Sequence, residues 1–398
     1  ILFLLLQSVP LKAQWTQVGL DGYYIRTITV SGSNVFVGTS GDGMFRSTNN
    51  GVSWLAANTG LVGLEFPAFA ISGSNLYAGS EGEGVFLSVN NGASWSALAP
   101  LTNQFVFALA VSGSDLYAGV DGGGVFRSTN NGASWTNSTS GMTNTRVSSL
   151  VVSGTNLFAG TFGGAGVYLS TNNGTSWVVA GNGLTNTEVQ TLNITPSLPG
   201  YMFAGTANGA FYTTNNGTSW NAINNGLTDT YVHSFAFSGT TIFAGTDFEG
   251  VFRSTNLGAS WTAMNQGLTN LTVWVLNAAG SNLFAGTNGS GVFKRPLSEM
   301  VAVHEVSSEI PGQFSLSQNY PNPFNPTTNI KFAITRAGKI TLNIYDINGK
   351  KLEELINGSY SAGSYKTEWN ASKYSSGIYF YTIVTNEFTD TKRMILVK

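Results

Sequence analysis

A unit of about 40 residues recurs along most of the chain, and this repetition constrains the fold more than any other feature. Its clearest segment reads GSNVFVGTSGDGMFRSTNNGVSW in the first copy and GSDLYAGVDGGGVFRSTNNGASW in the third, and seven copies can be aligned. No helical period of useful length occurs between them. Because one short unit cannot form a core alone, each must bury its apolar face against its neighbours.

Each unit reads as four short strands separated by turns. In the third copy these are FVFALAV (105–111), DLYAGV, GVFRST and SWTNST, and the first has the continuous apolar character of a strand buried on both faces. The SGS and NNG turns supply residues that accept positive φ angles, as hairpins require. Units of this length with four strands are typical of propeller blades, so the sequence predicts an all-β, seven-bladed β-propeller over residues 14–297.

The two ends of the repeat region complement each other. The last copy stops at GVFKRP without a Trp-containing strand, whereas QWTQVGL near the N-terminus is such a strand with no unit before it. We therefore expect the strand at Trp15 to complete the last blade and close the ring, which leaves no free sheet edge between the first and last blades. The seven outer strands then carry Trp15, Trp54, Trp95, Trp135, Trp177, Trp220 and Trp261.

A turn of the form STNNGASW joins the third and fourth strands in six copies. We expect its first Asn to cap backbone amides of the turn, its Gly to supply a left-handed residue, and its Trp to fill space beside the blade. These roles are structural, so the repetition specifies a fold rather than a chemistry. The asparagines are Asn49, Asn90, Asn130, Asn172, Asn215 and Asn256.

The order Ser47, Asn49, Gly51, Ser53, Trp54 resembles the Asp-box (BNR repeat) of sialidase-like propellers, Ser-x-Asp-x-Gly-x-Thr-Trp, with Asn in place of Asp and Ser in place of Thr. The resemblance extends over the whole repeat region. In that family the box lies far from the active site, so the resemblance implies the fold and not the chemistry.

Sialidases also carry three arginines that clamp the substrate carboxylate. Arg46, Arg127 and Arg253 match by number, but they occupy one repeat column in the third strand, where we expect them to lie too far from the axis to converge. Glu65 and Glu188 could be imagined as an acid/base pair for glycoside hydrolysis, but they stand three blades apart. The sequence thus favours a protein that is not an enzyme, and a glycoside hydrolase or lyase with other carboxylates remains the alternative.

Functional residues are expected where aligned units differ at an exposed edge, because identical blades have no structural reason to vary there. At the start of each innermost strand a constant Ile, Phe or Val, here called the anchor, is flanked by residues that change from copy to copy. These positions are predicted to lie at the mouth of the central channel, where propellers usually bind ligands. The candidate ligand-binding residues are Tyr24, Arg26, Glu65, Phe105, Phe107, Arg146, Glu188, Gln190, Tyr231, His233 and Trp274.

Aromatic rings beside Arg, Gln and Glu suit a sugar or a peptide, since flat rings stack on C–H faces and polar groups bind hydroxyls or amides. The loops between second and third strands reach the same face, and we expect them to give it an acidic rim. The alternative is that solvated loop tips vary freely, without a function. The acidic loop residues are Asp42, Glu81, Glu83, Asp121, Asp247 and Glu249.

Composition narrows the possible partners. Only 10% of residues are charged and the formal net charge is −2, so nothing attracts phosphate backbones or anionic lipid, and nucleic acid is not expected as a partner. The chain has no cysteine and two histidines, which excludes disulfides and Cys-ligated metal sites and leaves little for a His-based zinc site. We expect no metal and no cofactor.

The first residues, ILFLLLQSVPLKAQW, form an apolar run followed by a polar junction. We interpret residues 1–13 as a signal peptide with a truncated start. The run is too short to cross a membrane, so no integral span is expected. An ordinary buried N-terminal strand is the alternative.

After residue 297 the repeat ends and charged residues become more frequent. We predict a linker at 298–313 and a small antiparallel β-sandwich at 314–398, because this stretch alternates apolar and polar residues between hairpin turns such as NGK. Its segments QNYPNPFNPTT, ITLNIYDINGKKL, GSYKTEWNAS, SSGIYFYTI and KRMILVK resemble, in order, the C-terminal sorting domain of the type IX secretion system of the Bacteroidetes. An unrelated binding sandwich is the alternative.

That resemblance implies passage through the periplasm and across the outer membrane, with the secretion machinery as a partner. Together with the variable rim, it favours a secreted or cell-surface, monomeric propeller that recognises a glycan or a protein without catalysis. A propeller that scaffolds partner proteins is a third interpretation. It is distinguished from the recognition module by whether peptides or sugars compete for binding at the rim.

Overall fold

The computed structural model describes residues 14–297 except 100, 102, 103 and 196, together with 304–307 and 311–398 except 337, 361, 372 and 373. The chain divides into two compact units, one formed by Gln14–Arg295 and the other containing Pro296–Lys398. The predicted signal peptide at 1–13 and much of the predicted linker lie outside the described residues.

Seven four-stranded sheets with antiparallel pairing make up the described part of the first unit. The first strands of the sheets are β2 (Ile25–Ser31), β6 (Ala68–Ser72), β10 (Val106–Ser112), β14 (Val147–Ser153), β18 (Val189–Ile194), β22 (Val232–Ser238) and β26 (Val273–Ala279). The second strands are β3 (Asn34–Thr39), β7 (Asn75–Gly79), β11 (Asp115–Val120), β15 (Asn156–Thr161), β19 (Met202–Thr206), β23 (Thr241–Thr246) and β27 (Asn282–Thr287).

The outer half of each sheet is shorter. The third strands are β4 (Met44–Ser47), β8 (Val85–Ser88), β12 (Gly124–Ser128), β16 (Val167–Ser170), β20 (Gly209–Thr213), β24 (Val251–Ser254) and β28 (Val292–Pro296). The fourth strands are β5 (Leu55–Ala56), β9 (Ser96–Ala97), β13 (Thr136–Asn137), β17 (Val178–Val179), β21 (Asn221–Ala222), β25 (Thr262–Ala263) and, from the N-terminal end, β1 (Thr16–Gln17).

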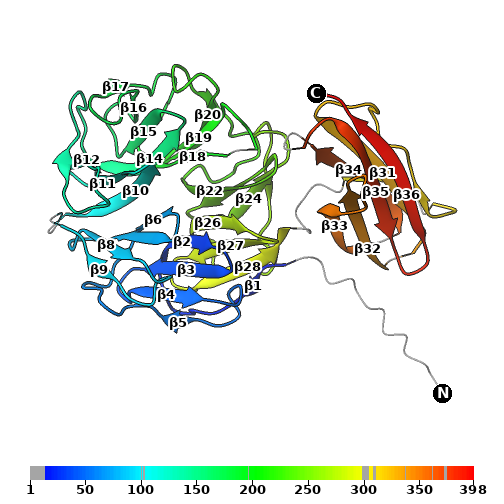
Figure 1. Cartoon of the computed structure of the whole chain (residues 1–398), viewed down its shortest axis with the longest axis horizontal. Helices are drawn as coiled ribbons and strands as arrows, with labels where there is room; N and C mark the ends of the chain where they lie inside the picture. The colour runs from blue at the N-terminus through cyan, green and yellow to red at the C-terminus, as the bar shows by residue number, and fades with distance from the viewer. Residues whose placement is uncertain are drawn as a thin grey trace. The chain divides into compact units, whose positions relative to one another are not determined.

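The first strands form a closed ring. Each contacts the first strand of the next sheet along the chain, and β26 also contacts β2. Figure 1 shows these strands nearest the centre, with the other strands of each sheet further out. This radial arrangement is a β-propeller, which confirms the predicted fold class, and each sheet is one blade.

Strand β1 completes the last sheet, as predicted. Thr16 pairs with Lys294 and Gln17 with Phe293, both on β28. The indole of Trp15 is buried and its Nε1–H donates to the carbonyl of Met264 at 2.6 Å, so the N-terminal segment also contacts the preceding blade. The two ends of the repeat region therefore share one sheet, and the ring has no open sheet edge between the first and last blades.

The repeated turn closes on itself through side chains. In the copy around Asn172, the Asn Oδ1 accepts the backbone N–H of Ser176 at 2.9 Å, and its Nδ2 donates to the hydroxyl of the same serine at 2.8 Å. Ser170 Oγ accepts the N–H of Gly174 and donates to Asn172 Oδ1. Asn173 and Gly174 both have positive φ, 54° and 80°, so two residues of the turn, not the Gly alone, are left-handed.

Most of the tryptophans after these turns join neighbouring blades. The Nε1–H of Trp177 donates to the carbonyl of Ser138 at 2.6 Å, and that of Trp220 to Ala180 at 2.7 Å, in each case a carbonyl of the preceding blade. Trp15, Trp54, Trp95 and Trp261 make the same bond. Trp135 is the exception, since it is only half-buried and its Nε1 lies buried without a hydrogen-bond partner.

The C-terminal unit contains two four-stranded sheets. The first orders β29 (His304–Ser307), β34 (Gly363–Asn370), β31 (Thr327–Ile334) and β30 (Ser315–Leu316). The second orders β33 (Lys351–Tyr360), β32 (Gly338–Tyr345), β35 (Gly377–Val384) and β36 (Thr389–Leu396). Alternating residues of the two sheets, Trp369 and Tyr381 among them, form one apolar core together with Phe324 from the segment before β31, as expected of an antiparallel sandwich.

One part of the predicted linker at 298–313 is wrong. His304–Ser307 forms β29, an edge strand whose His304 pairs with Lys366 and Glu305 with Tyr365 on β34. A strand of this length has too few alternating residues to be distinguished from a loop by pattern, and it becomes a strand because the edge of β34 supplies its partners.

Among the described residues, no helix is long and apolar enough to cross a membrane.

Candidate functional site

A β-bulge stands at the mouth of the channel in six of the seven first strands. The register of each shifts directly after the anchor residue, for example between Ile25 and Thr27 in β2 and between Val232 and Ser234 in β22. A bulge bends the strand and redirects the extra side chain. The six residues left out of register are Arg26, Phe107, Ser148, Gln190, His233 and Trp274.

The anchor residues explain why the neighbouring side chains turn outward. Ile25, Val106 and Val232 are fully buried, as are the anchors of the other first strands. In β6 the residue after the anchor is Pro67, which precedes the strand and makes no bulge, because proline has no N–H to donate to the ladder. Five of the predicted rim residues are therefore the bulged residues themselves. The other six, Tyr24 among them, stand immediately before an anchor.

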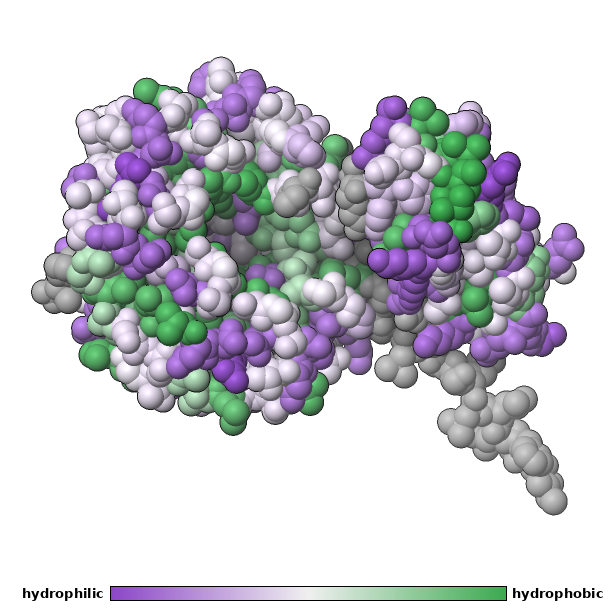
Figure 2. Space-filling view, in the orientation of Figure 1, coloured by the Kyte–Doolittle hydropathy of each residue, from purple (hydrophilic) through white to green (hydrophobic). Residues whose placement is uncertain are grey.

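A third set of residues extends the mouth, each following a second strand. Its backbone N–H donates to the residue before the anchor, as from Asp121 to Phe105 and from Phe162 to Arg146. This bond continues the pairing of first and second strands beyond the bulge and holds the two sets side by side. The third set is Ser40, Glu81, Asp121, Phe162, Ala207, Asp247 and Asn288. Figure 2 shows one face of this unit hollowed near the centre of the ring.

Tyr24, Arg26 and Trp274 form an aromatic cluster across the junction of the first and last blades. The guanidinium carbon of Arg26 lies 5.3 Å from the ring centroid of Trp274, a cation–π distance, and the Tyr24 ring lies 6.3 Å from the same indole. Tyr24 remains 47% exposed. An exposed ring beside an indole and a guanidinium is a surface on which a sugar or a peptide side chain can stack.

Arg26 also reaches the second blade, where two carboxyl groups meet. Its Nη2 lies 3.3 Å from Glu81 Oε1, and Glu81 is hydrogen-bonded to Glu65. Burial, together with the hydrogen bond to Glu65, raises the pKa of Glu81 to about 7, and the charge of Arg26 offsets this only in part. Glu81 is therefore protonated in part near neutral pH.

Arg146 is held by an acidic residue of the neighbouring blade. Its Nε donates to Asp121 Oδ1 at 2.8 Å, and its guanidinium carbon lies 5.4 Å from the ring of Phe162. Phe162 in turn contacts Phe107 edge to face, with centroids 6.3 Å apart. Neither Phe162 nor its contacts were predicted, because only the acidic residues were singled out in the loops that follow the second strands.

His233 is a structural partner of Asp247. The two side chains approach to 3.0 Å between Nε2 and Oδ1, and the imidazole lies 4.7 Å from the ring of Tyr231. Burial lowers the pKa of His233 despite the hydrogen bond to Asp247, so the neutral imidazole donates to the carboxylate at neutral pH. Burial, with the charges of Glu188 and Asp247, raises the pKa of the Tyr231 hydroxyl, which stays protonated.

The structure thus brings many of the predicted rim residues together across blade boundaries. Some pairs join neighbouring blades, as Arg26 with Glu81 and Arg146 with Asp121, and others lie within one blade, as His233 with Asp247. Two of the three arginines of the third strands have different partners: Arg127 pairs with Asp115, and Arg46 donates to the carbonyl of Asn91. Among the described residues, no group of three His, Cys, Asp or Glu side chains could hold a metal ion.

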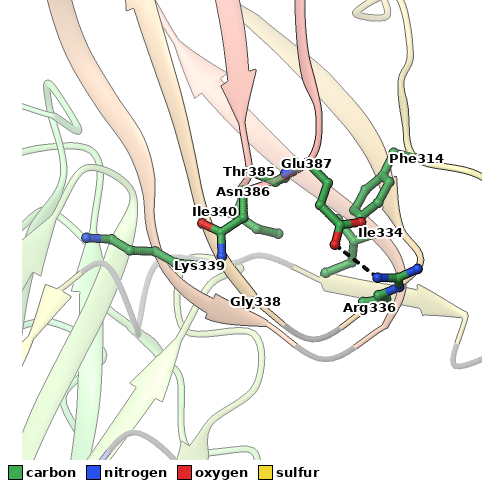
Figure 3. Close-up of a pocket in the computed structure, with 9 residues that line it drawn as sticks. All are labelled: Phe314, Ile334, Arg336, Gly338, Lys339, Ile340, Thr385, Asn386 and Glu387. Carbon is green, nitrogen blue, oxygen red and sulfur yellow. Dashed lines mark hydrogen bonds and ion pairs between the residues drawn. The ribbon is translucent and has the colours of Figure 1, made fainter.

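A separate pocket lies in the C-terminal sandwich (Figure 3). It holds a volume of about 80 Å³ and lies between the ends of β31, β32 and β35, with Phe314 and Ile340 among its lining residues. Arg336 Nη1 donates to Glu387 Oε1 at 3.0 Å along its edge, and both side chains are largely exposed. The pocket is small and has one exposed ion pair, so it is not the better candidate for a ligand site.

Comparison with known families identifies the C-terminal unit. Residues 318–398 match the family described as the secretion system C-terminal sorting domain. This is the type IX sorting domain, so the chain is exported, to the cell surface or into the medium, and interacts with the secretion machinery. No curated protein matches the chain in sequence.

Solved structures resemble the chain in fold. A GH74 enzyme of Niastella koreensis has a TM-score of 0.55 at 19% identity over 69% of this chain and 43% of its own. YCF48 from Cyanidioschyzon merolae has a TM-score of 0.56 at 14% identity, over 71% of this chain and 98% of its own. The extracellular domain of BT4673 from B. thetaiotaomicron has a TM-score of 0.58 at 12% identity, over 97% of this chain and 59% of its own.

These identities are low enough that the likeness concerns the fold alone. The chain spans less than half the length of the GH74 enzyme that it resembles. The resemblance includes enzymes and proteins of other kinds, among them the WD40 propeller domain of Doa1. The repeat region is therefore a β-propeller, and a C-terminal sorting domain for export follows it in the chain. The chemistry of the channel mouth must be argued from its own residues.

Proposed function

We propose that this chain is a secreted or surface-attached recognition module whose seven-bladed propeller binds a glycan or a protein at the channel mouth without turnover. The repeated turns are variant Asp-boxes in which Asn performs the capping role of Asp. The observation that supports recognition best is the aromatic cluster of Tyr24, Arg26 and Trp274, because it joins an exposed ring to polar groups at the point where the ring of blades closes.

Absence of turnover is favoured by the carboxyl geometry. Glycosidases that retain configuration hold two carboxyl groups about 5 Å apart, and inverting enzymes hold them further apart. Glu65 and Glu81 instead share a hydrogen bond, which leaves no room for a glycosidic bond between them. We propose on this ground that their role is to shape the surface.

Binding can be tested with the full chain on an array of glycans and peptides. The double variant Arg26→Ala/Trp274→Ala removes the polar and aromatic groups of the mouth. The matched control Arg46→Ala/Tyr320→Ala removes the same kinds of side chain from a third strand and from the exposed loop before β31. Recognition at the mouth predicts that the first variant loses binding and the control keeps it. Equal binding by both variants would contradict a mouth site.

A glycoside hydrolase is the second candidate, and one observation favours it. Glu81 is protonated in part at neutral pH, as a general acid must be, and some structures of similar fold are GH74 enzymes. Release of reducing ends from xyloglucan, abolished by Glu81→Gln, would establish this activity. No release above the rate of a buffer blank would remove it.

A further inference from the structure

The acidic residues of the propeller lie almost entirely on one of its two faces. Because the strands of a blade alternate in direction, the loops that enter the first strands and those that join second to third strands emerge on the same side, here called the loop face. Ten of the eleven Asp and Glu residues between 14 and 297 belong to these loops. They are Asp21, Asp42, Glu65, Glu81, Glu83, Asp121, Glu188, Asp229, Asp247 and Glu249.

The cations of the loop face are already engaged. Its two arginines are Arg26, which pairs with Glu81, and Arg146, which pairs with Asp121. His233 is neutral and bound to Asp247. The other described Lys and Arg side chains of the unit belong to third strands. An acidic ligand, such as a sialylated or uronic sugar, would therefore meet carboxylates without a cation to receive it.

The same face exposes large apolar side chains. Phe248 is 70% exposed and stands between Asp247 and Glu249 at a loop tip, and Leu64, directly before Glu65, is 51% exposed. An apolar surface rimmed by polar residues is typical of sites that bind other proteins. Tyr24, Val62, Phe105 and Leu271 are the other exposed large apolar residues of these loops.

We propose that the loop face binds a basic segment of a partner protein, one in which Lys or Arg alternates with apolar residues. Charge complementarity selects the positive residues, and the exposed rings and aliphatic chains receive the apolar ones. The carboxylates belong to the loops of five of the seven blades, those of β2, β6, β10, β18 and β22, so an extended peptide can contact several blades, whereas a short sugar would use only the mouth. This inference rests on the proposed function and names the chemistry of its ligand.

The test measures binding of the full chain to short synthetic peptides of three kinds, rich in Lys and Leu, in Gln and Leu, and in Glu and Leu. We expect binding to the Lys peptides only, weakening as NaCl is raised from about 0.05 to about 0.5 M. Glu65→Gln/Glu188→Gln should weaken it by about tenfold or more. The control Glu368→Gln/Glu387→Gln changes net charge equally on exposed residues of the sorting domain and should leave binding unchanged.

A second pair of variants tests the apolar part. Phe248→Ser on the loop face should weaken binding to the Lys–Leu peptides, whereas Val52→Ser, 72% exposed in a turn at the other end of the blade, should not. Equal binding of Lys and Gln peptides, or binding that the mouth variants leave unchanged, would overturn the proposal.

Two outcomes separate this inference from the proposed function. If a neutral glycan binds in a manner that depends on Arg26 and Trp274 while no basic peptide binds, recognition at the mouth stands and the basic partner falls. If chitosan oligomers bind through the mouth carboxylates and peptides do not, the ligand is a cationic sugar and the proposed protein partner is wrong. If no probe responds to any mouth variant, both fall.

Discussion

At the scale of single residues, the mouth is built by one residue of irregular backbone in six of the seven blades. The bulge after the buried anchor of these blades lets neighbouring strands keep the same pattern of pairing while the extra side chain differs, from Arg26 to His233 to Trp274. Variation is therefore confined to positions where it does not disturb the ring. This separation allows repeated blades to carry a surface that is not repeated.

The raised pKa of Glu81 leads to a prediction about pH. The folded-state pKa of Glu81 is raised to about 7 from 4.5, so the stability linked to its proton is present below pH 4.5 and is lost as pH rises toward 7. Glu81→Gln has no such proton to lose. We expect the melting temperature of the variant, relative to that of the unchanged chain, to be higher at pH 8 than at pH 5. A difference independent of pH would contradict the raised pKa of Glu81.

The capping asparagine makes a second prediction at this scale. Asn172→Ala leaves the backbone N–H of Ser176 without its acceptor and should lower the free energy of unfolding by about 1 kcal/mol. Asn172→Asp keeps an acceptor oxygen at the same place and should cost clearly less. Urea denaturation of the two variants measures the difference, and equal losses would show that the cap is not what the asparagine contributes.

At the scale of elements, the tryptophans that follow the turns differ in what they contribute. Trp220 is 4% exposed and its indole bonds the preceding blade, whereas Trp135 is half-buried and its indole N–H has no hydrogen-bond partner. Trp220→Ala should therefore cost about 3–5 kcal/mol, and Trp135→Ala distinctly less. Denaturation by urea checks this ranking, which a larger loss for Trp135→Ala would reverse.

Elements also mark the limits of prediction from sequence. Strands that repeat, such as β10 to β13, could be predicted because seven aligned copies reveal the same alternation. Strand β29 could not, since its four residues have no copy and become a strand only through pairing with β34. The sequence pattern identifies a strand when the alternation of residues is clear locally or recurs in several copies. It fails when the strand forms only because a distant strand offers an edge to pair with.

The candidate site shows the same division. Comparison of repeat columns predicted which positions reach the mouth, because the anchor residues align. It did not predict that Arg26 meets Glu81, that Glu65 and Glu81 share a hydrogen bond, or that Phe162 packs on Phe107. Those contacts join different blades or different strands of one blade, and their geometry depends on how the ring closes.

At the scale of the whole molecule, closure depends on a short segment at the start of the propeller. Deleting residues 14–20 removes β1 and the buried indole of Trp15 and leaves β28 with an open edge. We expect a clear fall in melting temperature and a tendency to associate through the exposed edge. The matched control deletes residues 1–13 alone and should have the same melting temperature as the full chain. A deletion of 14–20 that melts at the same temperature would mean that the ring does not depend on β1.

We propose above that the exported propeller recognises its ligand at the channel mouth. The most direct measurement compares the full chain, Arg26→Ala/Trp274→Ala and Arg46→Ala/Tyr320→Ala on one array of glycans and peptides, after equal melting temperatures have shown that all three are folded. A binding site at the mouth predicts a ligand that binds the unchanged chain and the control pair but not the mouth pair. A ligand retained equally by all three would place recognition elsewhere on the molecule and rule out the mouth site.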